Sequence, residues 1–105
     1  MQGKYRLAVT SNAKKMFSEH VRFLNQECPS AADRLVVSYK NALMRIADNP
    51  FQFPVADELD IPDLPSNIFR KCLFEGRYKA LFRLEGKEAF IVSVVDSRRE
   101  NKGVL

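Results

Sequence analysis

Apolar and polar residues alternate along the last third of the chain, from Phe69 to Arg99. Two short alternating runs meet at Gly76-Arg77, and a third run, apolar from Ala89 to Val95, follows Glu85-Gly86-Lys87. This period of two, with glycine-containing joints of two to three residues, is typical of an antiparallel meander. We therefore predict three strands here, with the third in the centre of the sheet and buried on both sides.

The first half of the chain shows an alternating stretch and then a helical pattern. Lys4 to Val9 alternates like a strand with one buried face. Thr10 and its neighbours offer side-chain oxygens that can cap a helix, and from Ala13 to Glu27 apolar residues recur every three or four positions. The predicted apolar stripe of this first helix consists of Ala13, Met16, Phe17, His20, Phe23 and Leu24.

A second helix is predicted after Pro29, which prevents the first from continuing. Ser30 and Asp33 have the spacing of a capping pair, and the helical pattern runs to about Asp48. Because the connection is short, the two helices should form an antiparallel hairpin. The element order is then β-α-α-β-β-β, an α+β fold in which the hairpin covers one face of a small, mainly antiparallel twisted sheet. The predicted stripe of the second helix is Ala32, Leu35, Val36, Tyr39, Leu43, Ile46 and Ala47.

Asn49-Pro50 ends the second helix and begins a proline-rich connector that reaches Asn67. We expect Phe51 and Phe53 to plug the end of the core. Further along, the connector is acidic and contains no base, whereas residues 67–105 hold nine basic and five acidic groups. The acids of the connector are Asp57, Glu58, Asp60 and Asp63.

The totals agree with a single soluble domain spanning residues 1–105. Net charge is +4 with a pI near 9.3, which makes an anionic partner plausible. Cys28 and Cys72 stand far apart without metal-ligand spacing, so we expect reduced thiols. No apolar run is long enough for a signal peptide or a membrane span, and a cytoplasmic location without membrane partners is predicted.

Several kinds of chemistry find little support in the residues. His20 is the only histidine and falls on or beside an apolar helix stripe, which favours a structural role. No glycine-rich phosphate loop is present, and no cluster has the spacing of a metal site. The sequence therefore predicts no cofactor and no metal.

A basic set remains, concentrated in the predicted meander. Residues of like parity share a strand face, so Lys79 and Arg83 should point the same way, and we expect Arg70 to join them across the hairpin. Such a face is either a solvated surface or a site for phosphate or an acidic partner. Fixed cations could also stabilise the charge that develops on phosphate in RNA cleavage. The set comprises Arg70, Lys71, Arg77, Lys79, Arg83, Arg98, Arg99 and Lys102.

In this arrangement the sequence resembles the RelE/ParE superfamily of toxins from bacterial type II toxin–antitoxin modules. The resemblance covers nearly the whole chain, and it is carried first by Thr10 to Ala13 leading into the helical hairpin and by Asn49-Pro50 ending it. It is carried above all by Phe69-Arg70-Lys71, Tyr78 to Leu84 and Ile91 to Arg99. These stretches resemble the family's pattern of an aromatic-Arg strand, a Tyr-Arg-x-x-Tyr strand and an apolar strand ending in Arg.

The resemblance implies roles for particular residues. Arg70, Lys79 and Arg98 match basic residues of the nuclease face and are the candidate catalytic residues. Cys72 falls where nucleases often carry a second base, and the C-terminal tyrosine of some nucleases is missing. If the protein is an enzyme, the resemblance implies a ribosome-dependent endoribonuclease, but these departures favour a ParE-like, non-nuclease member. Candidates for binding target or antitoxin are Lys71, Arg77, Arg83 and Arg99.

The resemblance also implies partners. A cognate antitoxin protein would neutralise the toxin, and the target would be DNA gyrase or ribosome-bound mRNA. We further hypothesise that the acidic connector Asp57 to Asp63 lies over the rim of the basic site. Two other interpretations stay open: a non-enzymatic basic RNA-binding module, and a relative of these toxins that survives as an interaction domain.

Overall fold

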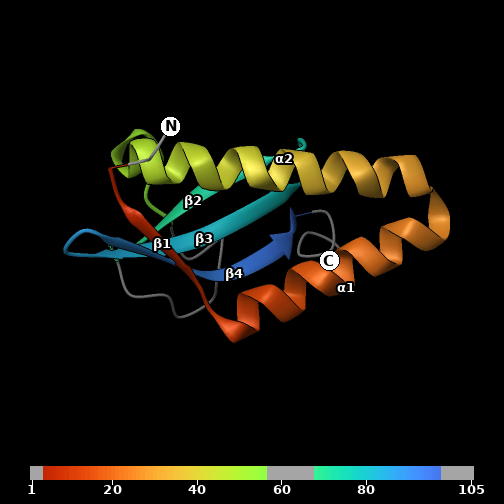
Figure 1. Cartoon of the computed structure of the whole chain (residues 1–105), viewed down its shortest axis with the longest axis horizontal. Helices are drawn as coiled ribbons and strands as arrows, with labels where there is room; N and C mark the ends of the chain where they lie inside the picture. Colours follow the sequence, from red (N-terminus) through yellow and green to blue (C-terminus); the bar gives the residue numbers. More distant parts are fainter. Residues whose placement is uncertain (1–3, 57–67, 98–105) are drawn as a thin grey trace.

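Two long helices cover one face of a four-stranded sheet (Figure 1). The computed structural model describes residues 4–56 and 68–97. Strand order across the sheet is β1-β4-β3-β2, with β1 parallel to β4 and the other pairs antiparallel. The predicted β-α-α-β-β-β order and the mainly antiparallel sheet are confirmed. The elements are β1 (Arg6–Val9), α1 (Ser11–Glu27), α2 (Pro29–Asp48), a 3₁₀ turn (Pro50–Gln52), β2 (Phe69–Phe74), β3 (Tyr78–Glu85) and β4 (Glu88–Asp96).

Helix α1 starts where the sequence offers a cap. The Ala13 N–H donates to the Thr10 hydroxyl oxygen at 3.1 Å, which satisfies an amide that has no partner within the helix. Val21 packs against the core, whereas Phe23 is 41% exposed. The prediction that Phe23 lies on the packed stripe was therefore wrong, because Phe23 falls at the border of the stripe that Phe17, Val21 and Leu24 form.

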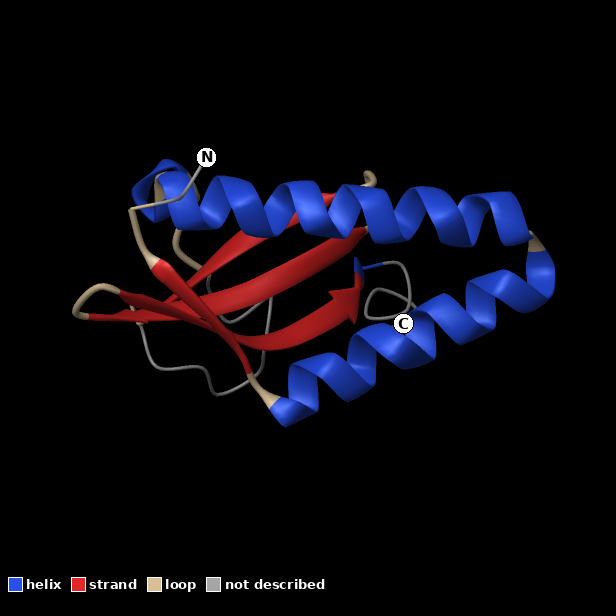
Figure 2. Ribbon diagram, viewed as in Figure 1, coloured by secondary structure: helices blue, strands red, loops and turns tan. Residues whose placement is uncertain are grey.

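One residue joins the two helices. Cys28 ends α1 by donating its N–H to the Leu24 carbonyl at 2.8 Å, and it is also the N-cap of α2. The predicted Ser30 and Asp33 capping pair was wrong, since no side chain caps α2. Pro29 at the first position of α2 removes one of the amides that a cap would satisfy. The two helices meet at this junction in an antiparallel hairpin, as predicted (Figure 2).

The core lies between the hairpin and the sheet. Phe17 of α1 stacks on Tyr39 of α2 with ring centroids 3.9 Å apart, and Tyr39 contacts Phe74 of β2. Ala42 belongs to the core although the predicted stripe omitted it. The core residues that are fully buried include Leu35, Ile46, Cys72, Ala80, Phe82, Ala89, Ile91 and Val94.

The two phenylalanines after α2 differ in their surroundings. Phe53 is buried and packs edge to face on Phe82, with centroids 5.9 Å apart, so its predicted plugging role is confirmed. Phe51 is 59% exposed, and the same prediction was wrong for it. The 3₁₀ turn that starts at Pro50 directs the two side chains differently.

Strand β4 lies inside the sheet between β1 and β3, as predicted, but it is buried on one face only. Ala89, Ile91 and Val94 are fully buried toward the helices, while Phe90 and Val95 are half-buried. The prediction of burial on both sides was wrong because both helices pack on the same face. No helix in the described part of the chain is long and apolar enough to cross a membrane.

Candidate functional site

The turn between β2 and β3 determines which residues share a face of the sheet. Glu75 and Gly76 have φ values of 56° and 65°, and the Arg77 N–H donates to the Phe74 carbonyl at 3.3 Å. Two consecutive positive φ angles are typical of the type I′ turn, whose twist matches that of the strands. The loop contains a third residue, Arg77, so that Phe74 pairs with Tyr78, and every other pair in the hairpin follows from that one.

Three cations share the face of the sheet that points away from the helices. Lys71 lies opposite Leu81, Lys79 lies opposite Leu73, and Arg83 lies opposite Phe69. Directly opposed residues of an antiparallel pair point to the same side, so Lys71 is a diagonal neighbour of both Lys79 and Arg83. We call Lys71, Lys79 and Arg83 the basic face. The predicted common orientation of Lys79 and Arg83 is confirmed.

Arg70 does not belong to the basic face. It pairs with Phe82, whose side chain is in the core, and it therefore points to the helix side of the sheet. Its Nη1 donates to the Phe53 carbonyl at 2.6 Å, and its guanidinium lies over the Phe51 ring. The expectation that Arg70 joins Lys79 and Arg83 was wrong. The turn pairs even-numbered residues of β2 with even-numbered residues of β3, so Arg70 lies on the face opposite to that of Lys79 and Arg83.

Cys72 also points to the helix side. It pairs with Ala80, is fully buried and belongs to the hydrophobic core. Burial raises the pKa of its thiol, an effect that the positive charge of Arg45 reduces. A neutral buried thiol of this kind packs as a small apolar group, so Cys72 is separated from the basic face by the sheet itself.

The basic face is less open than expected. Lys79 is only 9% exposed, and Leu81 beside it is fully buried. Arg83 stacks on Phe90, with Cζ 4.5 Å from the ring centroid, and pairs with Glu85. Of the two interpretations of this face, a solvated surface does not hold for Lys79. Arg83 and Lys71 remain half-buried at its surface.

Arg77 is held in a buried ion pair. Its Nη2 lies 2.8 Å from Asp96 Oδ2, and its Nε lies 3.1 Å from both carboxylate oxygens. The side chain of Asp96 is 2% exposed, and this hydrogen-bonded carboxylate raises the pKa of Arg77. The Ser97 N–H donates a hydrogen bond to the Arg77 carbonyl at 2.9 Å. Asp96 was not among the predicted site residues, because its only signal in the sequence is an acid at the end of an apolar strand.

His20 has the structural role that the sequence predicted. Its Nε2 lies 2.8 Å from the Val94 carbonyl, and its ring lies against Tyr78 with centroids 5.3 Å apart. Arg98, Arg99 and the acidic connector Asp57 to Asp63 lie outside the described residues. Within residues 4–56 and 68–97, no group of three His, Cys, Asp or Glu side chains is placed to hold a metal ion.

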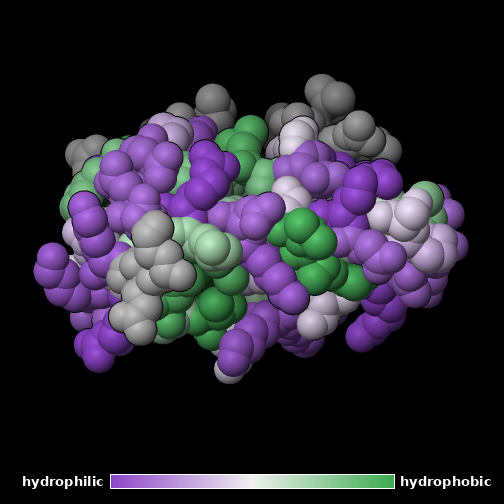
Figure 3. All heavy atoms as spheres, turned by 45° about the horizontal axis from the view of Figure 1, so that its top comes forward, coloured by the Kyte–Doolittle hydropathy of each residue, from purple (hydrophilic) through white to green (hydrophobic). Residues whose placement is uncertain are grey.

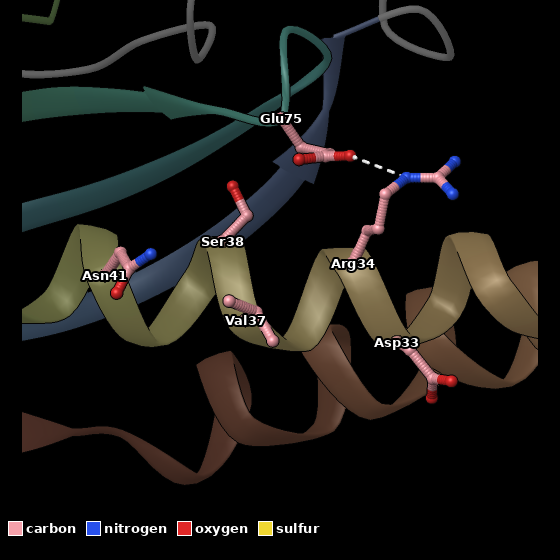
Figure 4. A pocket seen from close by; sticks show the side chains of 6 residues that line it. All are labelled: Asp33, Arg34, Val37, Ser38, Asn41 and Glu75. Carbon is pink, nitrogen blue, oxygen red and sulfur yellow. Dashed lines mark ion pairs between the residues drawn. The ribbon is translucent and has the colours of Figure 1, made fainter.

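A hollow lies between α2 and the β2–β3 turn (Figure 4). Arg34 Nε and Glu75 Oε2 pair across it at 3.7 Å, and the exposed Val37 forms part of its floor. This hollow was not predicted from the sequence, because its residues come from a helix face and a turn that lie far apart in the chain. Seen from the α2 side, the surface is mostly hydrophilic with separate apolar areas (Figure 3). The lining consists of Asp33, Arg34, Val37, Ser38, Asn41 and Glu75.

Together, the fold and the basic face define a small α+β protein that presents lysine and arginine on the sheet face opposite a helical hairpin. Among solved structures, the chain is similar to the chromosomal ParDE TA (toxin–antitoxin) system from P. aeruginosa. The TM-score is 0.69 and the identity 17%, and the match covers 89% of this chain and 96% of that chain. The chain therefore has a ParE-like fold, which confirms the resemblance to the RelE/ParE superfamily at the level of the fold. No protein-family model matches the chain, and no curated protein matches it in sequence.

Proposed function

We propose that this protein is the toxin of a type II toxin–antitoxin module, neutralised by a cognate antitoxin protein. The proposal is carried by the fold correspondence, which spans 89% of this chain and almost the whole of the matched ParDE chain. The basic face adds support, because lysine and arginine held close together on one surface fit an anionic or acidic partner. The antitoxin is one such partner, and the toxin's target is another.

We propose further that the toxin acts by binding, with DNA gyrase as its target, rather than by cleaving mRNA. Cleavage needs cations to stabilise the phosphate and a group that moves protons at the same place. Arg70, the first candidate for this role, points to the other side of the sheet, and His20 bonds to the Val94 carbonyl. Lys79 is the remaining described catalytic candidate on the basic face, and it is largely buried.

The proposal can be tested by inducing the protein in a bacterial host. We expect growth arrest, inhibition of DNA supercoiling by purified gyrase, and intact transcripts in primer extension. Substituting Lys71→Glu and Arg83→Glu together should relieve the arrest by reversing the charge of the two less buried cations of the basic face. The matched control is Lys14→Glu with Lys15→Glu, which changes the charge equally on an exposed turn of α1 and should still arrest growth.

The outcomes separate the claims. Accumulation of soluble, folded protein without growth arrest would refute the toxin proposal. Growth arrest with transcripts cleaved at ribosome-bound codons would support the toxin proposal and refute gyrase as its target. Equal toxicity of the basic-face variant and the control would refute the role of the basic face.

A second candidate function is a non-toxic interaction domain built on the same fold. It is favoured by the burial of Lys79 and by the pairing of Arg77 with Asp96, which engage two candidate cations in the protein's own structure. In that case induced expression should leave growth unchanged. Binding to generic RNA that weakens steeply with added salt would then identify the RNA-binding form of this alternative.

A further inference from the structure

A second group of cations lies away from the basic face, where the end of α2, the start of the chain and the β3–β4 turn come together. Arg70 reaches this place from the helix side of β2. The group combines three cations with three aromatic rings from four separate segments, and we call it the cation–aromatic cluster. Its members are Tyr5, Arg45, Phe51, Phe53, Arg70 and Lys87.

Each cation of the cluster lies over a ring. Arg70 Cζ is 5.2 Å from the centroid of Phe51, and Lys87 Nζ is 5.3 Å from the centroid of Tyr5. The two rings contact each other edge to face, with centroids 6.2 Å apart. The result is a row of cation, ring, ring and cation, in which each charge is fixed by a ring face. A surface held in this way loses little side-chain freedom when it binds a partner.

The third cation extends the row toward α2. Arg45 Cζ lies 5.1 Å from the centroid of Phe53, and the Phe53 carbonyl accepts the hydrogen bond from Arg70. The Arg45 carbonyl in turn accepts a hydrogen bond from Gln52 at 3.2 Å. The two arginines are therefore tied to the same short segment after α2.

None of the three cations forms an ion pair with a carboxylate in residues 4–56 and 68–97. Asp48 is the acid closest to Arg45 along α2, and it makes no ion pair there either. By contrast, Arg77 and Arg83 each have a carboxylate partner. The three cations are therefore not neutralised by a carboxylate of the described residues, which leaves them able to pair with an anionic partner.

Exposed apolar residues lie near Arg70. Val55 lies directly opposite Arg70 in an isolated bridge, and Ile68 lies two residues before it, in the turn that leads into β2. Their exposed fractions are 37% and 52%, and that of Phe51 is 59%. Large exposed apolar groups placed around charged ones are a common feature of protein interaction sites.

We propose that the cation–aromatic cluster binds an acidic peptide segment that carries an aliphatic or aromatic anchor residue. Carboxylates of the segment would pair with Arg45, Arg70 and Lys87, and the anchor would pack on Phe51 and its apolar neighbours. Single-stranded nucleic acid fits less well, because it needs open ring faces for stacking, and here a cation covers one face of each ring in the row. Arginine and aromatic residues are also the commonest energetic centres of protein–protein interfaces. The proposal does not depend on the proposed toxin function.

The test is an NMR titration of the full chain, labelled with ¹⁵N, with a short synthetic peptide of alternating glutamate and leucine. We expect amide shifts concentrated at Tyr5, Phe51, Arg70 and Lys87. Lys87→Glu and, separately, Phe51→Ser should each weaken the affinity roughly tenfold. Both side chains are exposed, so the variants should fold, and the spectrum of each variant checks this directly. Arg22→Glu makes the same charge change on an exposed position of α1 and should leave the affinity unchanged.

Three further probes decide between recognition modes. A peptide of alternating glutamine and leucine and a peptide of alternating glutamate and serine should each bind more weakly than the glutamate–leucine peptide. Equal binding of either one would overturn the proposal, since charge or the apolar anchor would then be unnecessary. Tighter binding of oligouridylate at the same amides would assign the cluster to nucleic acid instead. Shifts that are absent, or that lie elsewhere on the molecule, would also refute it.

Discussion

Replacing Arg77 with methionine should lower the free energy of unfolding more than the same replacement of Arg83 on β3. Methionine keeps the aliphatic bulk of the side chain but removes the guanidinium, and with it three hydrogen-bond contacts to Asp96. The carboxylate stays behind with 2% of its side chain exposed. Water cannot replace the lost partner there, so the charge of Asp96 is less well compensated.

The size of the effect follows from the burial of the two partners. Removing one member of a buried ion pair costs about 3–5 kcal/mol. Arg77 is 24% exposed, so we expect the lower end, about 3 kcal/mol of the free energy of unfolding. Domains of this size are stable by only about 5–15 kcal/mol, so this is a large share. At about 4 °C per kcal/mol, Tm should fall by about 12 °C.

The measurement is thermal and urea-induced unfolding of three variants beside the unmodified chain. Arg83→Met is the matched control: it removes the same group from β3, but its ion pair with Glu85 is exposed, so it should cost less than about 1 kcal/mol. In the double variant, Asp96→Leu should recover part of the loss caused by Arg77→Met, because no buried charge is then left. An Arg77→Met loss within about 0.5 kcal/mol of zero, or strictly additive losses, would refute the reasoning.

Three other predictions concern the turn and the thiols. Glu75 adopts a left-handed conformation that asparagine tolerates better, so Glu75→Asn should raise the free energy of unfolding by about 0.5–1 kcal/mol, and a loss in urea unfolding would contradict this. The exposed Cys28, whose pKa is lowered chiefly by its hydrogen bond with Ser30, should react with a disulfide reagent in the folded protein, whereas Cys72 should react only as the chain unfolds. Burial raises the Cys72 pKa above its ordinary 9.0, so its contribution to stability is complete below that pH and is lost as the pH rises further. In the Cys72→Val variant, the free energy of unfolding should fall less steeply as the pH rises above 9.0. An unchanged dependence on pH would show that Cys72 does not cause the loss.

The order of elements could be predicted because each depends on local pattern. A period of two marked the strands, a period of three to four marked the helices, and Pro29 separated them. The helix stripes were less accurate at single positions, as Phe23 and Ala42 show. Tertiary packing decides which residues at the border of a stripe are buried, so the pattern alone fixes the centre of the stripe but not its border.

The composition of the basic face could not be predicted in the same way. Whether Arg70 or Lys71 joins Lys79 depends on the number of residues in the turn, and one residue more or less would reverse the answer. The turn proved to place Phe74 opposite Tyr78, and this pairing sends Arg70 and Cys72 to the helix side. The sequence motifs by themselves do not determine how β2 and β3 are paired.

The register of β2 also separates the two surfaces that we propose. Arg70 and Lys71 are neighbours in the chain, yet one lies in the cation–aromatic cluster and the other on the basic face. A glutamate at position 71 should therefore affect growth arrest without changing binding of the acidic peptide, and one at position 70 should do the reverse. Because adjacent strand residues point to opposite sides, these two changes test the two surfaces within the same local backbone. If both changes abolished both activities, the two surfaces would have to act as a single site that wraps the edge of the sheet at β2.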